Sequence, residues 1–383
     1  MCESNHRHLA PLLLWFLLAP GVQAGADPAD GNSEADASPP SNAEPDLRNE
    51  DSPAKLQFGN NIVAVPIPTS DPTLGAGLIG VAGYYWPQSE QQADVQPPSL
   101  TGIAGMYTDS DSWALGLGQA SYWGQNTWRL RAAVGYAELN LPLLANDLLG
   151  LPVNVDWKLD GGLAYAQLSR RVAGKWFVGL QGRYLDINQD FSLAIGSINF
   201  DLVTEVETAS LGPHVEYDSR DSTNAPQTGR LFTIDILATR GVGQSDIAYE
   251  SYGAEFRSYH QLVDPLVLAW RLKACYRGGE AQLWDACRIS LRGFPETDYM
   301  GLSSAMAEVE ARWQFASRWG AVAFAGAGRV NDSFRFRDDN DEVPSYGVGI
   351  RWMVSKKNRV NLRIDYARSS GSDALYLFVG EAF

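Results

Sequence analysis

From residue 62 onward, apolar and polar residues alternate along this chain with a period of two. That period belongs to a β-strand with two differently solvated faces, because successive side chains point to opposite sides of a strand. In residues 127–136, one face would carry Trp128, Leu130, Ala132, Val134 and Tyr136, and the other Arg129, Arg131, Ala133 and Gly135. Aromatic rings thus close an apolar row at both ends, which is typical of a strand that faces lipid between two interfacial belts.

Three more stretches repeat the arrangement. The apolar rows are Trp176, Val178, Leu180 and Tyr184; Leu266, Leu268, Trp270, Leu272 and Tyr276; and Val360, Leu362, Ile364 and Tyr366. The opposite rows hold Gln181 and Arg183; Arg271, Lys273 and Arg277; and Asn361, Arg363 and Asp365. The dry core of a β-sandwich would not tolerate such charges, so the pattern predicts a barrel with a wet or polar interior.

Composition agrees with this prediction. The 383 residues include 12 Trp, 16 Tyr, 14 Phe and 37 Gly, and no apolar run is long enough for a membrane-spanning helix. A large secreted β-domain would share part of this composition. The net charge of −15 argues against nucleic acid as a partner.

The first 55 residues divide into two segments of different composition. Residues 1–26 combine an apolar core at 9–19 with small residues around Ala24, which predicts a signal peptide; a short membrane anchor is the alternative. Residues 27–55 are acidic and rich in proline, which predicts a disordered periplasmic tail.

Residues 56–383 are predicted to form one all-β domain, a sixteen-stranded antiparallel transmembrane β-barrel of the outer membrane. The candidate strands are 62–68, 75–85, 99–108, 113–123, 127–140, 153–171, 176–190, 203–218, 229–239, 249–261, 266–277, 304–315, 319–329, 345–354, 360–369 and 376–383. An even number of strands lets both ends of the domain lie in the periplasm.

Two cysteines remain once the signal peptide is removed. In an oxidising compartment, Cys275 and Cys287 are expected to form a disulfide, worth ~3 kcal/mol by loop entropy. No Cys/His spacing indicates a metal site. Residues 338–342 are acidic enough to attract a divalent cation, but a solvated loop fits them better.

Motifs for catalysis or cofactors are weak. Residues 75–80 match a dinucleotide-binding spacing but lack the strand–helix context, so glycines within a barrel strand are the better account, and we expect no cofactor. There is no nucleophile elbow, and His214 and His260 have no Ser or Asp companion at a readable spacing. An enzyme is therefore not expected, although an outer-membrane phospholipase stays open as an alternative.

Three motifs together carry a family resemblance. They are a turn with Arg220, Asp221, Pro226 and Gly229, the tripeptide Arg292-Gly293-Phe294 after the eleventh candidate strand, and a C-terminal segment ending in Gly380-Glu381-Ala382-Phe383. Alone, the first is an ordinary periplasmic turn and the last an ordinary final strand. In this order and spacing they resemble the barrel domain of the Omp85 superfamily (BamA/TamA, bacterial surface antigen D15) over residues 56–383.

The resemblance implies that the Arg-Gly-Phe loop folds into the barrel and that Arg292 contacts a carboxylate on the inner wall. In the family this carboxylate usually lies in a Phe-x-Asp-x-Gly pattern on strand 13. Here residues 324–328 carry Gly326 in the place of the Asp. Glu310 and Glu308, on the inner face of the preceding strand, are the substitute candidates. Gly380 and Phe383 would belong to a signal read by the barrel-assembly machinery.

By resemblance, the expected role is outer-membrane biogenesis: insertion of barrel proteins, or transport of protein or lipid. Expected partners are outer-membrane lipids and lipopolysaccharide, and either unfolded outer-membrane proteins or a separate periplasmic protein. Residues 27–55 are too few for a periplasmic POTRA domain, so substrate capture by such a domain is not expected of this chain. Pro66 and Pro68 in the first strand cannot donate ladder hydrogen bonds, which predicts a frayed seam with the last strand. A passive channel or structural barrel is the alternative function.

Overall fold

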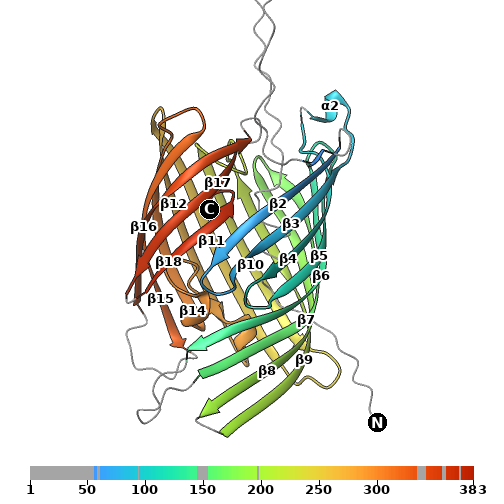
Figure 1. Ribbon diagram of the computed structural model, residues 1–383. Coiled ribbons are helices and arrows are strands. Elements are labelled where there is room, and N and C mark those ends of the chain that lie inside the picture. Colours follow the sequence, from blue (N-terminus) through green and yellow to red (C-terminus); the bar gives the residue numbers. More distant parts are fainter. Residues whose placement is uncertain are drawn as a thin grey trace, which may run out of the picture.

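One antiparallel sheet closes on itself into a barrel (Figure 1). The computed structural model describes residues 56–57, 61–93, 95–144, 154–195, 198–333, 342–355, 359–370 and 372–383. The predicted signal peptide (1–26), the acidic tail (27–55) and the acidic run 338–341 lie outside the described residues.

Eighteen strands make up the sheet, and two of them, β1 and β13, hold only two residues each, so sixteen long strands form the wall. The strands are β1 Leu56–Gln57, β2 Ile62–Asp71, β3 Gly75–Tyr85, β4 Leu100–Thr108, β5 Trp113–Trp123, β6 Trp128–Leu144, β7 Asn154–Ala173, β8 Trp176–Ile195, β9 Ile198–Asp218, β10 Gly229–Gly241, β11 Ala248–Val263, β12 Leu266–Arg277, β13 Cys287–Arg288, β14 Met300–Trp313, β15 Trp319–Ser333, β16 Glu342–Ser355, β17 Val360–Ser369 and β18 Ser372–Val379. The predicted sixteen-stranded barrel is confirmed. The glycine run 75–80 lies inside β3, as the strand interpretation requires.

The two ends of the barrel differ in their connections. We call the end where β2 begins and β18 ends the terminal end, and the opposite one the loop end. Terminal-end connections include the short segments 124–127, 174–175 and 264–265 but also the longer segments 86–99 and 219–228, whereas the loop end carries the longest of the described connections, 278–299 between β12 and β14. In the part of the chain that the structure describes, the short helices lie outside the wall: α2 (Glu90–Ala93), η2 (Leu283–Asp285) and η3 (Glu296–Asp298). No helix of the described residues is long and apolar enough to cross a membrane.

The predicted alternation of faces is present in the wall. Val134, Leu180 and Trp270 are exposed on the outer face, whereas Arg129 and Arg131 point inward and bind Glu216 of β9. Because large apolar side chains cover the outside and charges lie inside, the outer face suits lipid.

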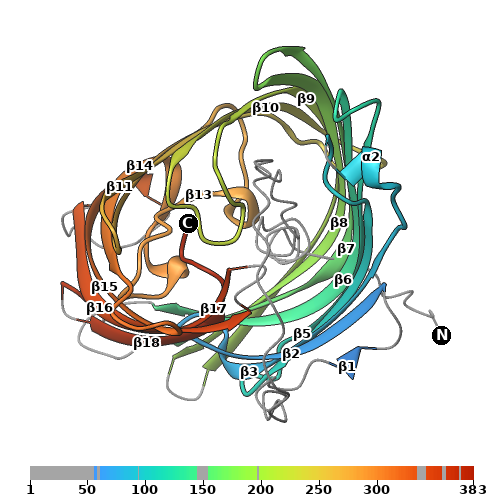
Figure 2. The same ribbon diagram turned by 90° about the horizontal axis from the view of Figure 1, so that it is seen from above.

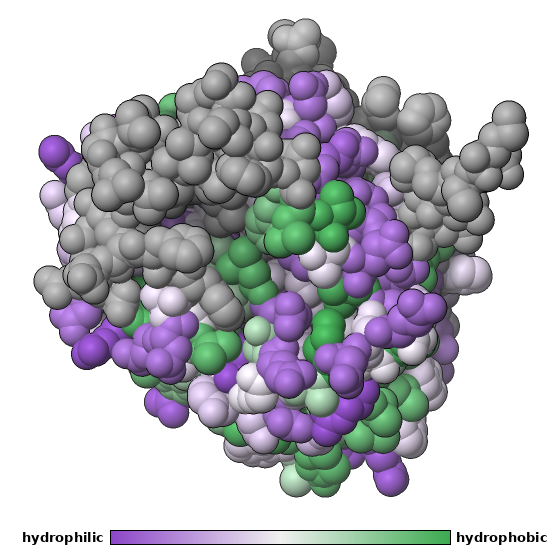
Figure 3. Space-filling view, turned by 90° about the horizontal axis from the view of Figure 1, so that it is seen from below, coloured by the Kyte–Doolittle hydropathy of each residue, from purple (hydrophilic) through white to green (hydrophobic). Residues whose placement is uncertain are grey.

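The interior is less uniformly polar than the sequence predicted. Toward the loop end, the inner faces of β6 to β9 are apolar and buried; their residues are Leu139, Leu141, Trp157, Leu159, Leu163, Leu185, Ile187 and Val206. Trp284 from the segment 278–299 belongs to the same cluster. The expectation of a wet lumen is therefore wrong for the half of the barrel toward the loop end. A segment that folds inward supplies apolar partners there, and the alternation within single strands does not predict such contacts. Hydrophobic side chains also gather near the middle of the face seen from below (Figure 3).

The last strand ends earlier than predicted. It spans Ser372–Val379 rather than 376–383, because Gly380 adopts φ 101°, a left-handed conformation suited to glycine, and the chain turns inward. Viewed from above, the C-terminus lies inside the ring of strands (Figure 2).

Candidate functional site: the lumen loop and its anchors

Residues 278–299, here called the lumen loop, fold into the barrel between β12 and β14 (Figure 2). A disulfide between Cys275 of β12 and Cys287 of β13, with Cα atoms 5.6 Å apart, ties the first half of the loop to the wall. β13 adds a short ladder to β14, in which Cys287 lies opposite Gly301. Trp284, Ile289 and Phe294 are almost fully buried. The loop is therefore packed as part of the interior.

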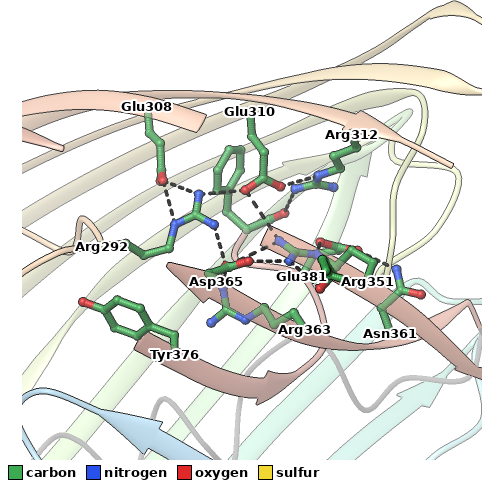
Figure 4. A network of polar contacts seen from close by, with 12 residues as sticks. Arg292, Glu308, Glu310, Arg312, Arg351, Asn361, Arg363, Asp365, Tyr376 and Glu381 are labelled. Atoms are coloured by element: carbon green, nitrogen blue, oxygen red, sulfur yellow. Dashed lines mark hydrogen bonds and ion pairs between the residues drawn. The ribbon is translucent and has the colours of Figure 1, made fainter. Parts of the chain in front are cut away.

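Arg292 is the centre of the loop's contact with the wall (Figure 4). Its Nη2 lies 2.6 Å from Glu308 Oε1 and 2.7 Å from Glu310 Oε2, and its Nη1 lies 2.7 Å from Asp365 Oδ2. The guanidinium also sits 3.4 Å above the centre of the Phe324 ring. Three carboxylates and a ring face thus hold one cation, which has only 7% of its side chain exposed.

Glu308 and Glu310 are the two partners that the sequence named, and both lie within hydrogen-bond distance of Arg292. Asp365, from β17, was missed. The sequence did place Asp365 on the inner face of residues 360–366. The alternation within one strand does not predict, however, which strands the loop contacts.

Gly326 explains why the wall carboxylate of the family pattern has no place here. A Cβ at this position would lie 2.7 Å from the Ala307 carbonyl oxygen and 2.9 Å from Leu291 Cδ2. Because the loop residue Leu291 packs directly against the wall at this point, a larger residue than glycine would push the loop away. The acidic partners stand instead on β14 and β17.

The ion pairs continue from Arg292 to the end of the chain by two routes. Glu310 binds Arg312 at 2.7 Å, and Arg312 Nη2 donates to the main-chain oxygen of Phe383 at 2.8 Å. Asp365 binds Arg351, and Arg351 Nε lies 2.8 Å from Glu381 Oε2. The loop and the inward-turned residues 380–383 therefore share one network.

This network is close to electroneutral. Glu308, Glu310, Asp365 and Glu381 face the guanidinium groups of Arg292, Arg312, Arg351 and Arg363. Removing one member would leave an uncompensated buried charge, which costs about 3–5 kcal/mol.

Gly293 and Phe294 extend the contact across β17 and β18. The Gly293 N–H donates to Tyr376 Oη at 2.8 Å, and Ser372 Oγ donates to the Gly293 carbonyl at 2.7 Å. Gly293 has φ 116°, and a Cβ there would lie 3.0 Å from the carbonyl carbon of Arg368. Phe294 packs its ring edge-on against Tyr299. Glycine therefore permits both the conformation and the close approach at this crossing.

A second anchor fixes the opposite side of the loop. Arg183 of β8 donates to both carboxylate oxygens of Asp285 at 3.0 and 2.8 Å, and Tyr249 Oη of β11 donates to Asp285 at 2.8 Å. Arg277 Nε donates to the Asp285 carbonyl at 2.8 Å. The loop thus spans the lumen from β8 to β17. The sequence placed Arg183 on the inner face but gave no sign of its partner.

Both loop anchors are held in their charged forms. Burial alone would raise the pKa of Asp285, but the charges of Arg183 and Arg277 more than offset it and keep that pKa below the ordinary value. Burial alone would lower the pKa of Arg292, but Glu310, Glu308 and Asp365 raise it above the ordinary value.

The turn between β9 and β10, residues 219–228, lies apart from the lumen loop, at the terminal end. Arg220 pairs with Asp218 at 2.9 Å, and Asp221 accepts hydrogen bonds from the main chain of Gln227 and Thr228. Asp221 also binds Arg359 of the β16–β17 connection at 2.8 Å. Because those strands lie across the barrel, the turn folds over the opening, as Figure 2 shows for the yellow-green segment.

Two further motif residues complete this turn. Pro226 is buried within it, and Gly229 closes it with φ 96°. A Cβ on Gly229 would lie 2.3 Å from the Ser219 carbonyl oxygen. The structure thus gives the turn motif a local role in chain folding and does not bring it to Arg292.

His214 and His260 each have a hydrogen-bond partner in the folded barrel. His214 Nδ1 lies 2.7 Å from Asp235 Oδ1 on the inner face, and Ser258 Oγ lies 2.8 Å from His260 Nε2 on the outer face. The expectation that neither has a Ser or Asp partner is therefore wrong: strand pairing and the two-residue period brought them together. Because the two pairs lie on opposite faces of the wall, they do not combine into a Ser-His-Asp arrangement in the described chain.

The acidic run 338–342 is described only at Glu342. Its carboxylate lies 3.3 Å from Arg329 Nη1 at an exposed site. Within the described residues no group of three or more His, Cys, Asp and Glu side chains is placed to hold a metal ion.

Comparison with known proteins adds a family and a set of similar folds. The sequence profile of the Omp85 superfamily domain matches residues 148–383. The fold is similar to the crystal structure of BamA from Haemophilus ducreyi lacking POTRA domains 1–3, with a TM-score of 0.53 and 14% identity over 84% of this chain and 70% of that one. No curated protein matches the sequence.

Two further structures are similar in fold. CdiB from Acinetobacter baumannii has a TM-score of 0.54 and 14% identity, covering 85% of this chain and 60% of its own. CdiB from Escherichia coli has a TM-score of 0.53 and 12% identity, covering 85% and 63%. This chain thus spans less than two thirds of either CdiB chain, and the likeness concerns the barrel.

Replacing Glu310 with Gln should loosen the lumen loop. The substitution leaves Arg292 and Arg312 without a shared buried carboxylate, so we expect a loss of about 3 kcal/mol in the free energy of unfolding and faster protease cleavage within 278–299. Limited proteolysis of the folded barrel measures the second effect. Glu216→Gln is the matched control, because Glu216 is an equally buried partner of two arginines on the far wall. Equal loop protection in wild type and Glu310→Gln would show that the network does not hold the loop.

Proposed function

Because this chain belongs to the Omp85 superfamily, we propose that it acts in outer-membrane biogenesis, by inserting barrel proteins or by moving protein or lipid through the membrane. The observation that carries the proposal is a seam in the wall between β18 and β2. It is the place where a closed barrel can open sideways with the least loss of hydrogen bonds.

The seam is joined by a single ladder pair, Leu377 opposite Ser70. The neighbouring pairs β2–β3 and β17–β18 have continuous registers, from Ile62 to Asp71 and from Leu362 to Ser369. In the register set by Leu377 and Ser70, Pro68 of β2 lies opposite Val379, the last residue of β18, and Pro66 lies beyond the end of β18; neither proline can donate a hydrogen bond. Few bonds therefore oppose separation of these two strands.

Residues 380–383 set how far the seam closes. Continuing the register of Leu377 and Ser70 beyond Val379 would place Glu381 opposite Pro66 and Phe383 opposite Ala64. Instead, Glu381 binds Arg351 and Asn361, and Phe383 is buried against Tyr259 and Ala269 inside the barrel. These contacts inside the barrel thus hold Glu381 and Phe383 away from the seam, where they would otherwise extend the ladder between β18 and β2.

In this proposal the terminal end faces the periplasm, with the signal peptide removed and residues 27–55 as a periplasmic tail. Outer-membrane lipids and lipopolysaccharide surround the wall. The substrates would be unfolded outer-membrane proteins, or material delivered by a separate periplasmic protein. Arg292, Gly293 and Phe294 would act by holding the network that positions β18.

Locking the seam tests the proposal. Cysteines at Ser70 and Leu377, which lie opposite each other, should form a disulfide that prevents the strands from parting. We expect this variant to fold but to fail to restore outer-membrane protein content and lipid asymmetry in a deletion strain. Quantitative outer-membrane proteomics and measurement of surface-exposed phospholipid are the readouts.

The matched control keeps the cysteine at 377 and moves its partner to Ile364, which lies opposite it on β17. That crosslink joins strands already fully paired, so it should restore function as wild type does. Full restoration by the crosslinked 70/377 variant would rule out lateral opening at this seam.

A passive channel is the second candidate, and one observation favours it. The inner faces of β6, β9 and β10 carry Arg129, Arg131, Glu216, His214 and Asp235, which suit an aqueous path. Three features argue against a passive channel: the lumen loop, the apolar cluster at the loop end and the β9–β10 turn at the terminal end.

Single-channel recording separates the two candidates. We expect small or flickering currents from the wild-type barrel, because the lumen loop fills the interior, and large steady currents when residues 282–299 are replaced by a short linker. A large steady conductance of the wild-type protein would favour the channel instead.

We propose no catalytic role for the His214–Asp235 and Ser258–His260 pairs, because each lacks the third group of a hydrolytic triad. The refolded barrel should therefore release no fatty acid from phospholipid vesicles beyond the background of a Ser258→Ala variant. Turnover that Ser258→Ala abolishes would instead support a phospholipase.

A further inference from the structure

A hollow of about 430 Å³ lies at the terminal end, where β9, β10 and β11 meet the β9–β10 turn. Its lining includes Tyr217, Ser219, Thr228, Arg230, Tyr259 and His260. The lining contains hydroxyl groups, an imidazole and a guanidinium but no carboxylate. The hollow is therefore suited to an anion.

Arg230 supplies the positive charge. It is exposed on the outer face of β10, opposite Ser258 of β11, and it makes no ion pair within the described residues. The carboxylates of the adjoining turn are already used, because Asp218 binds Arg220 and Asp221 binds Arg359. An arginine left without a partner beside neutral donors is free to bind an external anion.

The main chain at Arg230 is firmly held. Its N–H donates to Ser219 Oγ at 2.9 Å, and the Ser219 N–H donates to its carbonyl at 2.8 Å. These bonds fix the base of the side chain at the rim. The exposed side chain of Thr228 lies in the same lining.

Aromatic side chains place this hollow at the edge of the lipid-facing band. Trp176, Tyr217 and Phe232 pack against one another on the outer face, with ring centroids 5.0 and 6.3 Å apart, and Tyr217 also lines the hollow. Trp270 is exposed on the neighbouring strand β12, opposite Ser258. Rings of this kind mark the height of lipid headgroups, so Arg230 lies where the phosphates of the membrane surface lie.

We propose that this hollow binds the phosphate of an anionic phospholipid, with Arg230 donating to the phosphate oxygens and His260 and Thr228 completing the polar lining. The acyl chains would run along the outer face past Trp176 and Val178. The choice of phospholipid rather than lipopolysaccharide rests on the proposed function, in which the terminal end faces the periplasm.

Native mass spectrometry of the full chain in neutral detergent tests this. With phosphatidylglycerol and phosphatidylcholine supplied in equal amounts, the wild type should retain phosphatidylglycerol preferentially. Arg230→Gln should lower that retention about fivefold, the effect of one basic residue at a membrane surface, and Arg230→Lys should retain part of it, because a lysine keeps the charge without the bidentate geometry.

Arg240→Gln is the matched control. Arg240 lies on the outer face of the same strand, at the loop end, and already pairs with Glu250 at 3.0 Å. Lipid retention should be unchanged in this variant, and resistance of the folded barrel to unfolding in cold detergent should be equal in all four proteins. Unchanged retention in Arg230→Gln, or an equal loss in Arg240→Gln, would overturn the site.

Two further experiments complete the test. One distinguishes a lipid phosphate from a free phosphate, and the other tests the orientation of the barrel in the membrane. Millimolar inorganic phosphate should not displace the lipid; if it does, the hollow is a free-anion site and the lipid assignment fails. A cysteine at Thr228 should stay unlabelled by an impermeant maleimide in intact cells. Labelling would overturn both the orientation and the choice of phospholipid, whereas a protected cysteine with no lipid preference would overturn the lipid site alone.

Discussion

Closure of the sheet is the constraint on which the rest of this molecule depends. In hydrocarbon every backbone N–H and C=O must be paired within the protein, so a sheet with two free edges cannot persist in a membrane. Closure then requires one face for lipid and one for the interior, which is the two-residue alternation of the sequence. It also requires the first and last long strands to meet. Here they meet at one pair, Leu377 with Ser70, and the least satisfied part of the wall is the junction that closes it.

The contacts inside the barrel keep that junction short in a specific way. The charged network around Arg292 ties β14, β16 and β17 to the lumen loop, and through Arg312 and Arg351 it reaches Phe383 and Glu381. Buried ion pairs contribute little net stability relative to an apolar core, but separating one is costly. Such a network therefore fixes a geometry more than it strengthens the fold. What it fixes is an inward course for residues 380–383, which would otherwise extend β18 along β2.

The two-residue period predicts the limits of a strand correctly where those limits depend only on the strand's own residues. Residues 75–85, 113–123, 266–277 and 360–369 match the observed strands, because aromatic caps and turn residues mark their ends. The period did not predict the position of a segment or the partner of a side chain where these depend on residues distant in the sequence. The last candidate strand was predicted to run to Phe383, yet Gly380 turns the chain toward arginines on β14 and β16. Asp285 and Asp365 were invisible as partners, because only the folded loop brings them to Arg183 and Arg292.

The presence of Gly326 in place of the family's wall carboxylate affects how the lumen loop is coupled to the seam. An acceptor on β15 would hold the loop to a strand that lies three places from the seam. Asp365 lies instead on β17, directly beside β18, and it binds both Arg292 of the loop and Arg351, the partner of Glu381. Because β18 is paired along its length to β17 and at one point to β2, any displacement of the seam strand must move Asp365 or break its contacts. The lumen loop of this barrel is therefore coupled to the seam more directly than an acceptor at position 326 would allow.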